Sequence, residues 1–146
     1  MKFLAAAVST LALATGVLAQ SAYIEKPADG DSVTAGSSLV IDVVRPNTIS
    51  SSQEVGIAIG ISSCTSKACL PANSTLGTLL YNGRFTPQYD EDQAATGQYQ
   101  PHQNITVQIP GDFTKGTAQI NFAHFFLLGA SLSPYIETSE VNVTVN

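Results

Sequence analysis

Hydrophobic and polar residues alternate with a period of two along most of the chain beyond residue 20. The segment 38–45 places Leu39, Ile41 and Val43 on one face, and the segment 55–62 alternates branched residues with glycine and alanine. Successive side chains of a β-strand point to opposite faces, so this pattern is typical of strands with one buried face. We therefore predict a chain built from strands and expect very little helix.

Seven segments with strand character are separated by turn-forming residues. The predicted turns lie at 27–31, 45–47, 82–83, 110–112 and 133–134, where Pro, Gly, Asn, Asp and Ser gather. Short, evenly spaced strands without a helical period favour an all-β protein, specifically an immunoglobulin-like antiparallel β-sandwich of about seven strands. The predicted strands are 22–25, 38–45, 55–62, 76–81, 104–109, 118–128 and 135–145.

Residues 1–19 have the features of a secretory signal peptide. Lys2 supplies a positive charge, an apolar stretch follows, and small or aliphatic residues precede Gln20. The alternative is an N-terminal membrane helix, which needs about 20 mainly apolar residues with charged flanks and is disfavoured by three hydroxyl residues within the stretch. We expect cleavage before Gln20, a single domain over 20–146, and a secreted, extracellular protein.

The chain carries few charges for its length. Of 146 residues, 6 are basic and 11 acidic, which gives a net charge of −5, or −6 once Lys2 is removed with the signal. The basic residues lie singly, whereas proteins that bind nucleic acid cluster theirs. No later stretch is long and apolar enough to span a bilayer. We expect no nucleic-acid partner, no membrane partner and a monomer.

Cys64 and Cys69 are the only cysteines and lie in a segment of small polar residues. In an oxidising compartment they are expected to form one local disulfide. A zinc site would need two further ligands, and His102 and His124 do not have the paired spacing of metal ligands. We therefore predict a disulfide that restrains a surface loop, and no metal or cofactor.

Three N-glycosylation sequons begin at Asn73, Asn104 and Asn142. Alternation tests the last two, because if the neighbouring Ile and Val residues face the core, Asn104 and Asn142 face solvent. We expect both acceptors to point outward; if they lie on different sheets, glycans would shield part of both flat faces.

The segment 118–128 begins with clean alternation, but from Ala123 both faces are apolar. Either a bulge changes the phase or Phe125 and Leu127 lie outside, where a loop covers them or where they form an exposed patch. His124 shares its face with Ile120 and Phe122. It is therefore predicted to be a hydrogen-bonded core histidine rather than a catalyst.

The segment 81–102 is the predicted contact surface for a partner. It combines aromatic residues with adaptable polar ones, as protein interfaces do, and the alternative is simple packing of a long loop. Its three adjacent carboxylates at 90–92 lack the spacing of a calcium loop and are expected to be solvated. The residues expected to make the contact are Tyr81, Phe85, Tyr89, Tyr99 and His102.

The sequence lacks the usual catalytic patterns. No Gly-x-Ser-x-Gly motif is present, and Glu137 and Glu140 lie three apart on a predicted strand, which directs them to opposite faces. Oxidative polysaccharide enzymes that bind copper use an N-terminal histidine, whereas the mature chain is expected to start at Gln20. We therefore predict that the protein is not an enzyme.

Seven segments spread over the predicted domain form a common pattern: SAYI at 21–24, PADGDSVTAG at 27–36, VVRPN at 43–47, VGIAIGI at 55–61, LGTLLYNG at 76–83, QNITV at 103–107 and AHFF at 123–126. The pattern resembles the necrosis-inducing secreted protein family, which comprises small, cysteine-poor effectors of filamentous fungi. The resemblance implies a non-enzymatic secreted protein that dampens plant immunity by binding receptor-associated kinases and can provoke plant cell death. It implies no catalytic residues.

Three functions remain open at this point. The first is an effector that binds a protein partner. The second is a cell-wall-associated or carbohydrate-binding immunoglobulin-like module, because the 27–36 segment also resembles modules of fungal cell-wall proteins. The third is a small hydrolase, which a pocket joining His102 or His124 to a carboxylate would favour.

Overall fold

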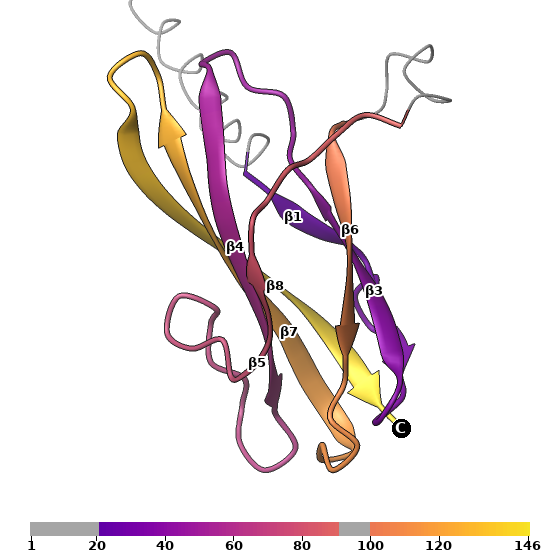
Figure 1. The fold of residues 1–146 in the computed structure, drawn as a ribbon. Coiled ribbons are helices and arrows are strands. Elements are labelled where there is room, and N and C mark those ends of the chain that lie inside the picture. The colour runs from indigo at the N-terminus through magenta and orange to yellow at the C-terminus, as the bar shows by residue number, and fades with distance from the viewer. Residues whose placement is uncertain (1–20, 91–99) are drawn as a thin grey trace, which may run out of the picture.

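The structure, a computed structural model, describes residues 21–90 and 100–146 (Figure 1). Within these two ranges the chain is all-β and contains no helix, and hence none long and apolar enough to cross a membrane. The strands are β1 (Tyr23–Lys26), β2 (Ser32–Val33), β3 (Ser38–Val44), β4 (Ser52–Ser63), β5 (Thr78–Gly83), β6 (His102–Gln108), β7 (Gly116–Leu128) and β8 (Ser133–Val145).

The strands form two sheets that share one core. The smaller sheet has the order β1-β3-β6 and the larger has the order β2-β8-β7-β4-β5. All neighbouring strands are antiparallel except β2 and β8, which are parallel. Figure 1 shows the long strands β4, β7 and β8 running the length of the molecule.

The core consists of branched and aromatic side chains from the inner faces of both sheets. Each buried side chain of this size stabilises the fold by about 1.5–3 kcal/mol relative to an exposed one. Its members on the strands include Ile41 and Val43 on β3, Ile57, Ile59 and Ile61 on β4, Ile105 and Val107 on β6, Ile120 and Phe122 on β7, and Val141, Val143 and Val145 on β8.

Residues 64–77, which we call the covering segment, lie against the outer face of the larger sheet. Gly60 and Gly77 permit this approach, because a Cβ atom at Gly60 would clash with the Leu76 carbonyl and one at Gly77 with the Ile61 carbonyl. Gly77 also has a φ of +75°, which favours glycine. On one face of β4 the isoleucines therefore pack in the core. On the other face Gly60 leaves room for the covering segment.

The seven predicted strands are all present, so the all-β prediction is confirmed. The sequence missed β2, because two residues that pair with β8 leave no periodic signal. Two predicted turns were wrong: 82–83 ends β5, and 133–134 begins β8. The parallel β2–β8 pair departs from the expected antiparallel arrangement, and the immunoglobulin-like β-sandwich stays a prediction.

Candidate functional site

The residues predicted to contact a partner do not form one exposed patch. Tyr89 is exposed, with 48% of its surface accessible, whereas Tyr81 is partly buried against the core. Phe85 is 1% exposed and belongs to the core itself, so its place in the contact surface is corrected. Tyr99 lies outside the described residues.

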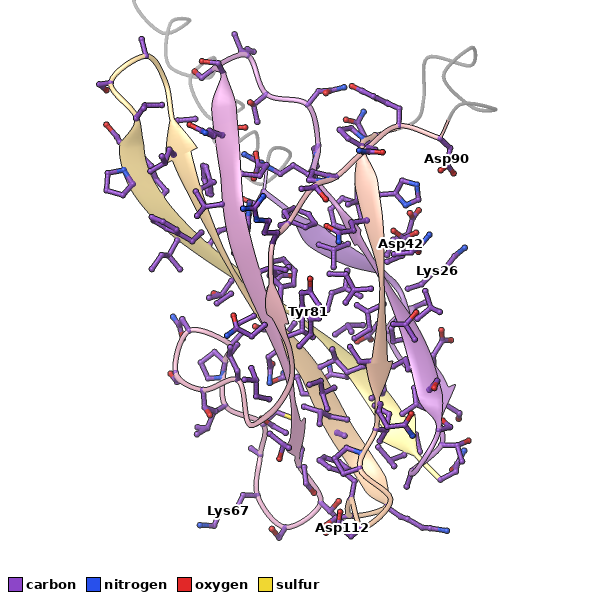
Figure 2. The ribbon with its side chains drawn as sticks, viewed as in Figure 1. Lys26, Asp42, Lys67, Tyr81, Asp90 and Asp112 are labelled. Atoms are coloured by element: carbon purple, nitrogen blue, oxygen red, sulfur yellow. A yellow bond between two sulfur atoms is a disulfide. The ribbon has the colours of Figure 1, made fainter. Side chains whose placement is uncertain are left out.

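His102 is buried rather than exposed, which corrects its role as a contact residue. It lies on the outer face of the smaller sheet, where the chain around Gln88 covers it. Gln88 exchanges two backbone hydrogen bonds of 2.9 Å with His102. The Nδ1 atom lies 2.7 Å from Oδ1 of the buried Asp42, and Nε2 lies 3.2 Å from Oδ1 of Asp90. Figure 2 shows Asp42 and Asp90 along this side of the molecule.

The two carboxylates control the protonation of His102. Burial disfavours the charged imidazolium, but the hydrogen bonds and charges of Asp42 and Asp90 outweigh burial and raise the pKa of His102. The protonated ring thus links Asp42 on β3 to Asp90.

A shallow, mainly polar pocket of about 360 Å³ lies beside His102. The Tyr89 hydroxyl donates a 2.6 Å hydrogen bond to Oδ1 of Asn47, which fixes the ring at the rim. An aromatic ring among amides and carboxylates suits ligands rich in hydroxyl groups. The pocket is lined by Thr86, Gln88, Tyr89, Asp90, His102, Gln103 and Asn104.

A second histidine, His124, lies at the centre of a charge network in the interior of the protein. Its side chain is fully buried, which confirms the prediction of a hydrogen-bonded core histidine. Nδ1 lies 2.8 Å from Oε1 of Glu137 on β8, and Nε2 lies 2.6 Å from Oε2 of Glu54 on β4. Both atoms are buried and neither has a well-aligned hydrogen-bond partner among the described residues, so this close contact acts as an ion pair when His124 is protonated.

The network extends from the larger sheet to the end of β3. Arg45 Nε lies 3.2 Å from Oε1 of Glu54, and the Arg45 guanidinium lies 4.8 Å from the centre of the Phe126 ring. The Glu137 carboxylate also accepts a 3.1 Å hydrogen bond from the backbone N–H of Ala22. When His124 is protonated, each charge in the series Arg45, Glu54, His124 and Glu137 therefore lies next to an opposite charge.

The network determines the charge of its members. Burial raises the pKa of Glu54, but its hydrogen bonds with His124 and Ser52 and the charge of Arg45 prevail and lower it to about 2. Burial opposes protonation of His124, yet Glu137 and Glu54 prevail and raise its pKa. A charged group removed from this network would leave its neighbours buried without compensation.

Both histidines are joined to carboxylates, the feature that would favour a hydrolase, but neither arrangement is that of a general base. His124 is fully buried, so a substrate does not reach it. Both ring nitrogens of His102 lie against carboxylates, so neither is left to take a proton from a nucleophile. The described residues include no cluster of three or more His, Cys, Asp or Glu side chains able to hold a metal ion.

Stability is expected to be greatest between about pH 4.5 and 6.5. A histidine whose pKa is raised on folding contributes stability that is complete below its unfolded value of 6.5 and is lost as pH rises through the folded value. Glu54 has a lowered pKa, so its contribution is complete above 4.5 and is lost as pH falls towards about 2. Denaturant melts from pH 3 to 9 test this, and a free energy of unfolding that rises between pH 6.5 and 8 would contradict it.

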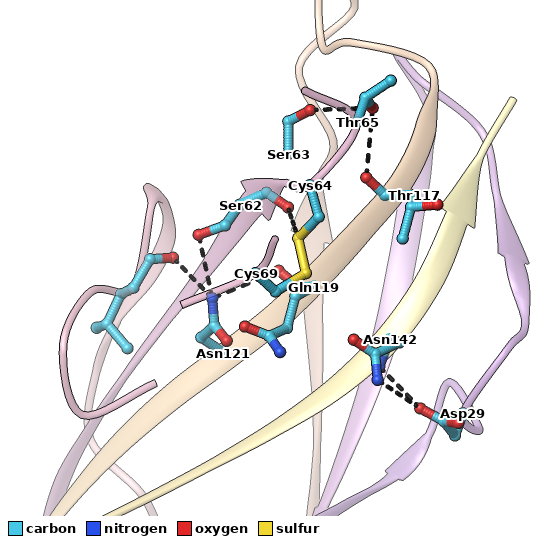
Figure 3. Close-up of a disulfide and its surroundings, with 11 residues drawn as sticks. Asp29, Ser62, Ser63, Cys64, Thr65, Cys69, Thr117, Gln119, Asn121 and Asn142 are labelled. Atoms are coloured by element: carbon cyan, nitrogen blue, oxygen red, sulfur yellow. Dashed lines mark hydrogen bonds between the residues drawn. A yellow bond between two sulfur atoms is a disulfide. The ribbon is translucent and has the colours of Figure 1, made fainter. Parts of the chain in front are cut away.

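Cys64 and Cys69 form the predicted disulfide, at the start of the covering segment (Figure 3). Asn121 on β7 holds the same segment by donating hydrogen bonds from Nδ2 to Ser62 Oγ at 3.2 Å and to the Leu76 carbonyl at 3.5 Å. On β8, Glu140 Oε2 accepts a 3.0 Å hydrogen bond from the N–H of Ala72. The disulfide is thus one of several attachments of this segment.

Replacing both cysteines with serine is expected to lower the free energy of unfolding by about 2 kcal/mol, because closing so short a loop restricts the unfolded chain only slightly. The fold should persist, since the core does not include the disulfide. Guanidinium melts of the variant and of the reduced wild-type protein should agree. Complete unfolding on reduction would show that the bond holds the fold.

All three sequon asparagines are exposed. For Asn104 and Asn142 the alternation predicted this exposure, and the structure places them on different sheets, on β6 in the smaller one and on β8 in the larger one. Asn142 differs in that its Nδ2 donates a 3.1 Å hydrogen bond to Asp29 Oδ1 (Figure 3). Attachment of glycans at these positions stays a prediction.

The strand β7 keeps its phase, and the bulge in this region lies in β4 between Glu54 and Gly56. Phe125 and Leu127 therefore point to the outer face of the larger sheet. The covering segment protects the part of that face around Asn121, whereas Phe125 is exposed and Leu127 partly so. The covering segment thus ends its contacts before the region in question, and Phe125 lies outside in an exposed position.

The fold and its surface define a small all-β domain with one disulfide and a buried charge network. The Nis1 family model matches residues 20–144. Necrosis-inducing secreted protein 1 of Colletotrichum orbiculare is 35% identical over 145 residues, which cover 98% of this chain and 76% of that protein. The chain belongs to the Nis1 family.

Proposed function

We propose that this protein is a secreted effector that modulates plant immunity or induces plant cell death by binding a protein partner. The observation that supports this most is the 35% identity to a necrosis-inducing secreted protein over almost the whole chain. The occupied ring nitrogens of His102 and the burial of His124 support a role in binding rather than catalysis. The partner we propose is a plant receptor-associated kinase, as the family resemblance implies.

Infiltration of the purified protein into leaves tests the proposal. We expect necrosis, or a reduced oxidative burst after an immune elicitor, and cross-linking to a purified receptor-associated kinase. Protein that has been irreversibly unfolded is the matched control. Folded protein that causes neither response and cross-links to no such kinase would contradict the proposal.

The pocket beside Tyr89 supports a second candidate function, the binding of cell-wall carbohydrate. Its polar lining and fixed aromatic ring suit a sugar. Chitin and β-glucan pull-downs with the wild-type protein and Tyr89→Ala test this candidate. Saturable glycan binding that is lost in the variant, without a protein partner, would replace the first proposal.

A further inference from the structure

Large apolar side chains are exposed at one end of the molecule, on both faces of the larger sheet and on the adjoining loops, and we call this region the apolar end. It consists of Ile49, Phe125, Leu132, Tyr135 and Ile136, five of the eleven exposed large hydrophobic residues that the described ranges contain. Ile49 is 97% exposed and Ile136 71%. Such a cluster on a secreted-type domain marks an interaction surface.

Two loops form this end and are joined to each other. The loop between β3 and β4 carries Ile49, and the turn between β7 and β8 carries Leu132. The N–H of Gly129 donates a 2.8 Å hydrogen bond to the Ser51 carbonyl, and Ser52 pairs with Leu128. Figure 1 shows both loops at the same upper end, away from the C-terminus.

The apolar end carries no charge. Residues 46–53 and 127–136 include no Asp, Glu, Lys or Arg, although the protein as a whole has a net charge of −5. Along the chain, these two stretches are flanked by Arg45, Glu54 and Glu137, whose charges meet that of protonated His124 in the buried network. The acidic character of the protein is therefore confined to the rest of its surface.

Leu132 occupies a conformation that disfavours its side chain. Its φ is +53°, in the left-handed region where glycine and asparagine are common and a bulky residue is an outlier. The side chain is also 51% exposed, so packing does not explain leucine at this position. A residue that is unfavourable in both conformation and exposure points to a function for its apolar side chain.

We propose that the apolar end inserts into the surface of a lipid bilayer with neutral headgroups. Ile49 and Leu132 would enter the boundary between headgroups and acyl chains, and Tyr135 would lie at the level of the headgroups, where amphipathic rings are favoured. The acidic remainder of the protein is repelled by anionic lipids, so neutral headgroups match its charge. The inference is independent of the proposed protein partner.

A bilayer fits this end better than a rigid partner does. Ile49 contacts almost nothing in its own chain, and the two loop apices carry aliphatic side chains among hydroxyl residues rather than the buried Arg or Trp anchors common at protein interfaces. A lipid surface is deformable, so the Ile49 loop and the Leu132 turn can both insert into it without a cavity that matches their shape. The sequence-based expectation of no membrane partner rested on the lack of a spanning segment, and such a segment is not needed here.

Flotation with phosphatidylcholine vesicles tests the inference on the purified secreted protein. We expect the protein to float with the vesicles, with little change between about 0.05 and about 0.5 M salt, because no charge takes part. Leu132→Asn and Ile49→Gln should each weaken binding about fivefold to tenfold, since each removes one inserted aliphatic side chain. Leu132→Asn should also raise the melting temperature by about 3 °C, because asparagine tolerates the left-handed conformation.

Val40→Asn provides the matched control, since Val40 is comparably exposed but lies on β3 in the other sheet. It should float as the wild-type protein does. The inference is overturned if the wild-type protein does not float, if flotation requires phosphatidylserine, or if Val40→Asn weakens it equally. A dimer that Leu132→Asn dissociates, without flotation of the wild-type protein, would assign the apolar end to a second copy of the chain instead.

Discussion

Replacing His124 with leucine is expected to lower the free energy of unfolding at pH 6 by about 3–5 kcal/mol. The substitution removes the positive charge between Glu54 and Glu137, whose carboxylates lie 2.6 and 2.8 Å from the ring nitrogens. Glu54 retains Arg45 as a partner, whereas Glu137 retains only the N–H of Ala22 among the contacts described above. Urea melts followed by circular dichroism measure the change.

A second substitution separates lost charge compensation from lost packing. In the double variant His124→Leu/Glu137→Gln, the carboxylate with the fewest remaining partners is neutral, so about 1–2 kcal/mol of the loss should return. The stability of His124→Leu should also depend less on pH above 6.5, since one of the two histidines with a raised pKa is gone. A loss below about 1 kcal/mol in His124→Leu would show that the network contributes little to the free energy of unfolding.

Phe85→Ala is expected to cost about 3–5 kcal/mol, which is the range for removing a buried aromatic side chain from a core. Phe85 is 1% exposed, and its ring meets that of His124 edge to face at a centroid distance of 4.8 Å. The substitution therefore opens a cavity and removes a contact of the charge network. Guanidinium melts give the size of the effect.

Tyr89→Ala is the control for Phe85→Ala, because both residues were predicted as partner contacts and only Tyr89 is exposed. Its loss should stay below about 1 kcal/mol, the value of the hydrogen bond to Asn47. Equal losses in the two variants would contradict a core position for Phe85. Necrosis that Tyr89→Ala abolishes without unfolding would assign Tyr89 to the contact with the partner.

Alternation predicted the strands because it is a local property of the backbone. Side chains along β6 face in and out as the sequence indicates, with Ile105 and Val107 buried and Asn104 exposed. The core position of His124 followed from the same parity. The disulfide was predictable because only two cysteines exist and they lie close together.

The charge network was not predictable, because its members are distant in sequence. Glu54, His124 and Glu137 meet only through the register of β4 with β7 and of β7 with β8. Glu137 and Glu140 do face opposite sides of β8, as expected, but parity alone gave no partner for either carboxylate. His102 was predicted as a surface residue because nothing local indicates that Gln88 pairs with it.

The sequence by itself determined seven of the eight described strands, most of their buried faces, the disulfide and the absence of charge from residues 46–53 and 127–136. Those are properties of neighbouring residues, and alternation and composition report them directly. Only the tertiary structure decided that these two uncharged loops lie at one end, that Phe85 is in the core and that His124 joins two carboxylates. Each of these depends on strand pairing across the chain, which brings together residues whose local sequences carry no information about one another.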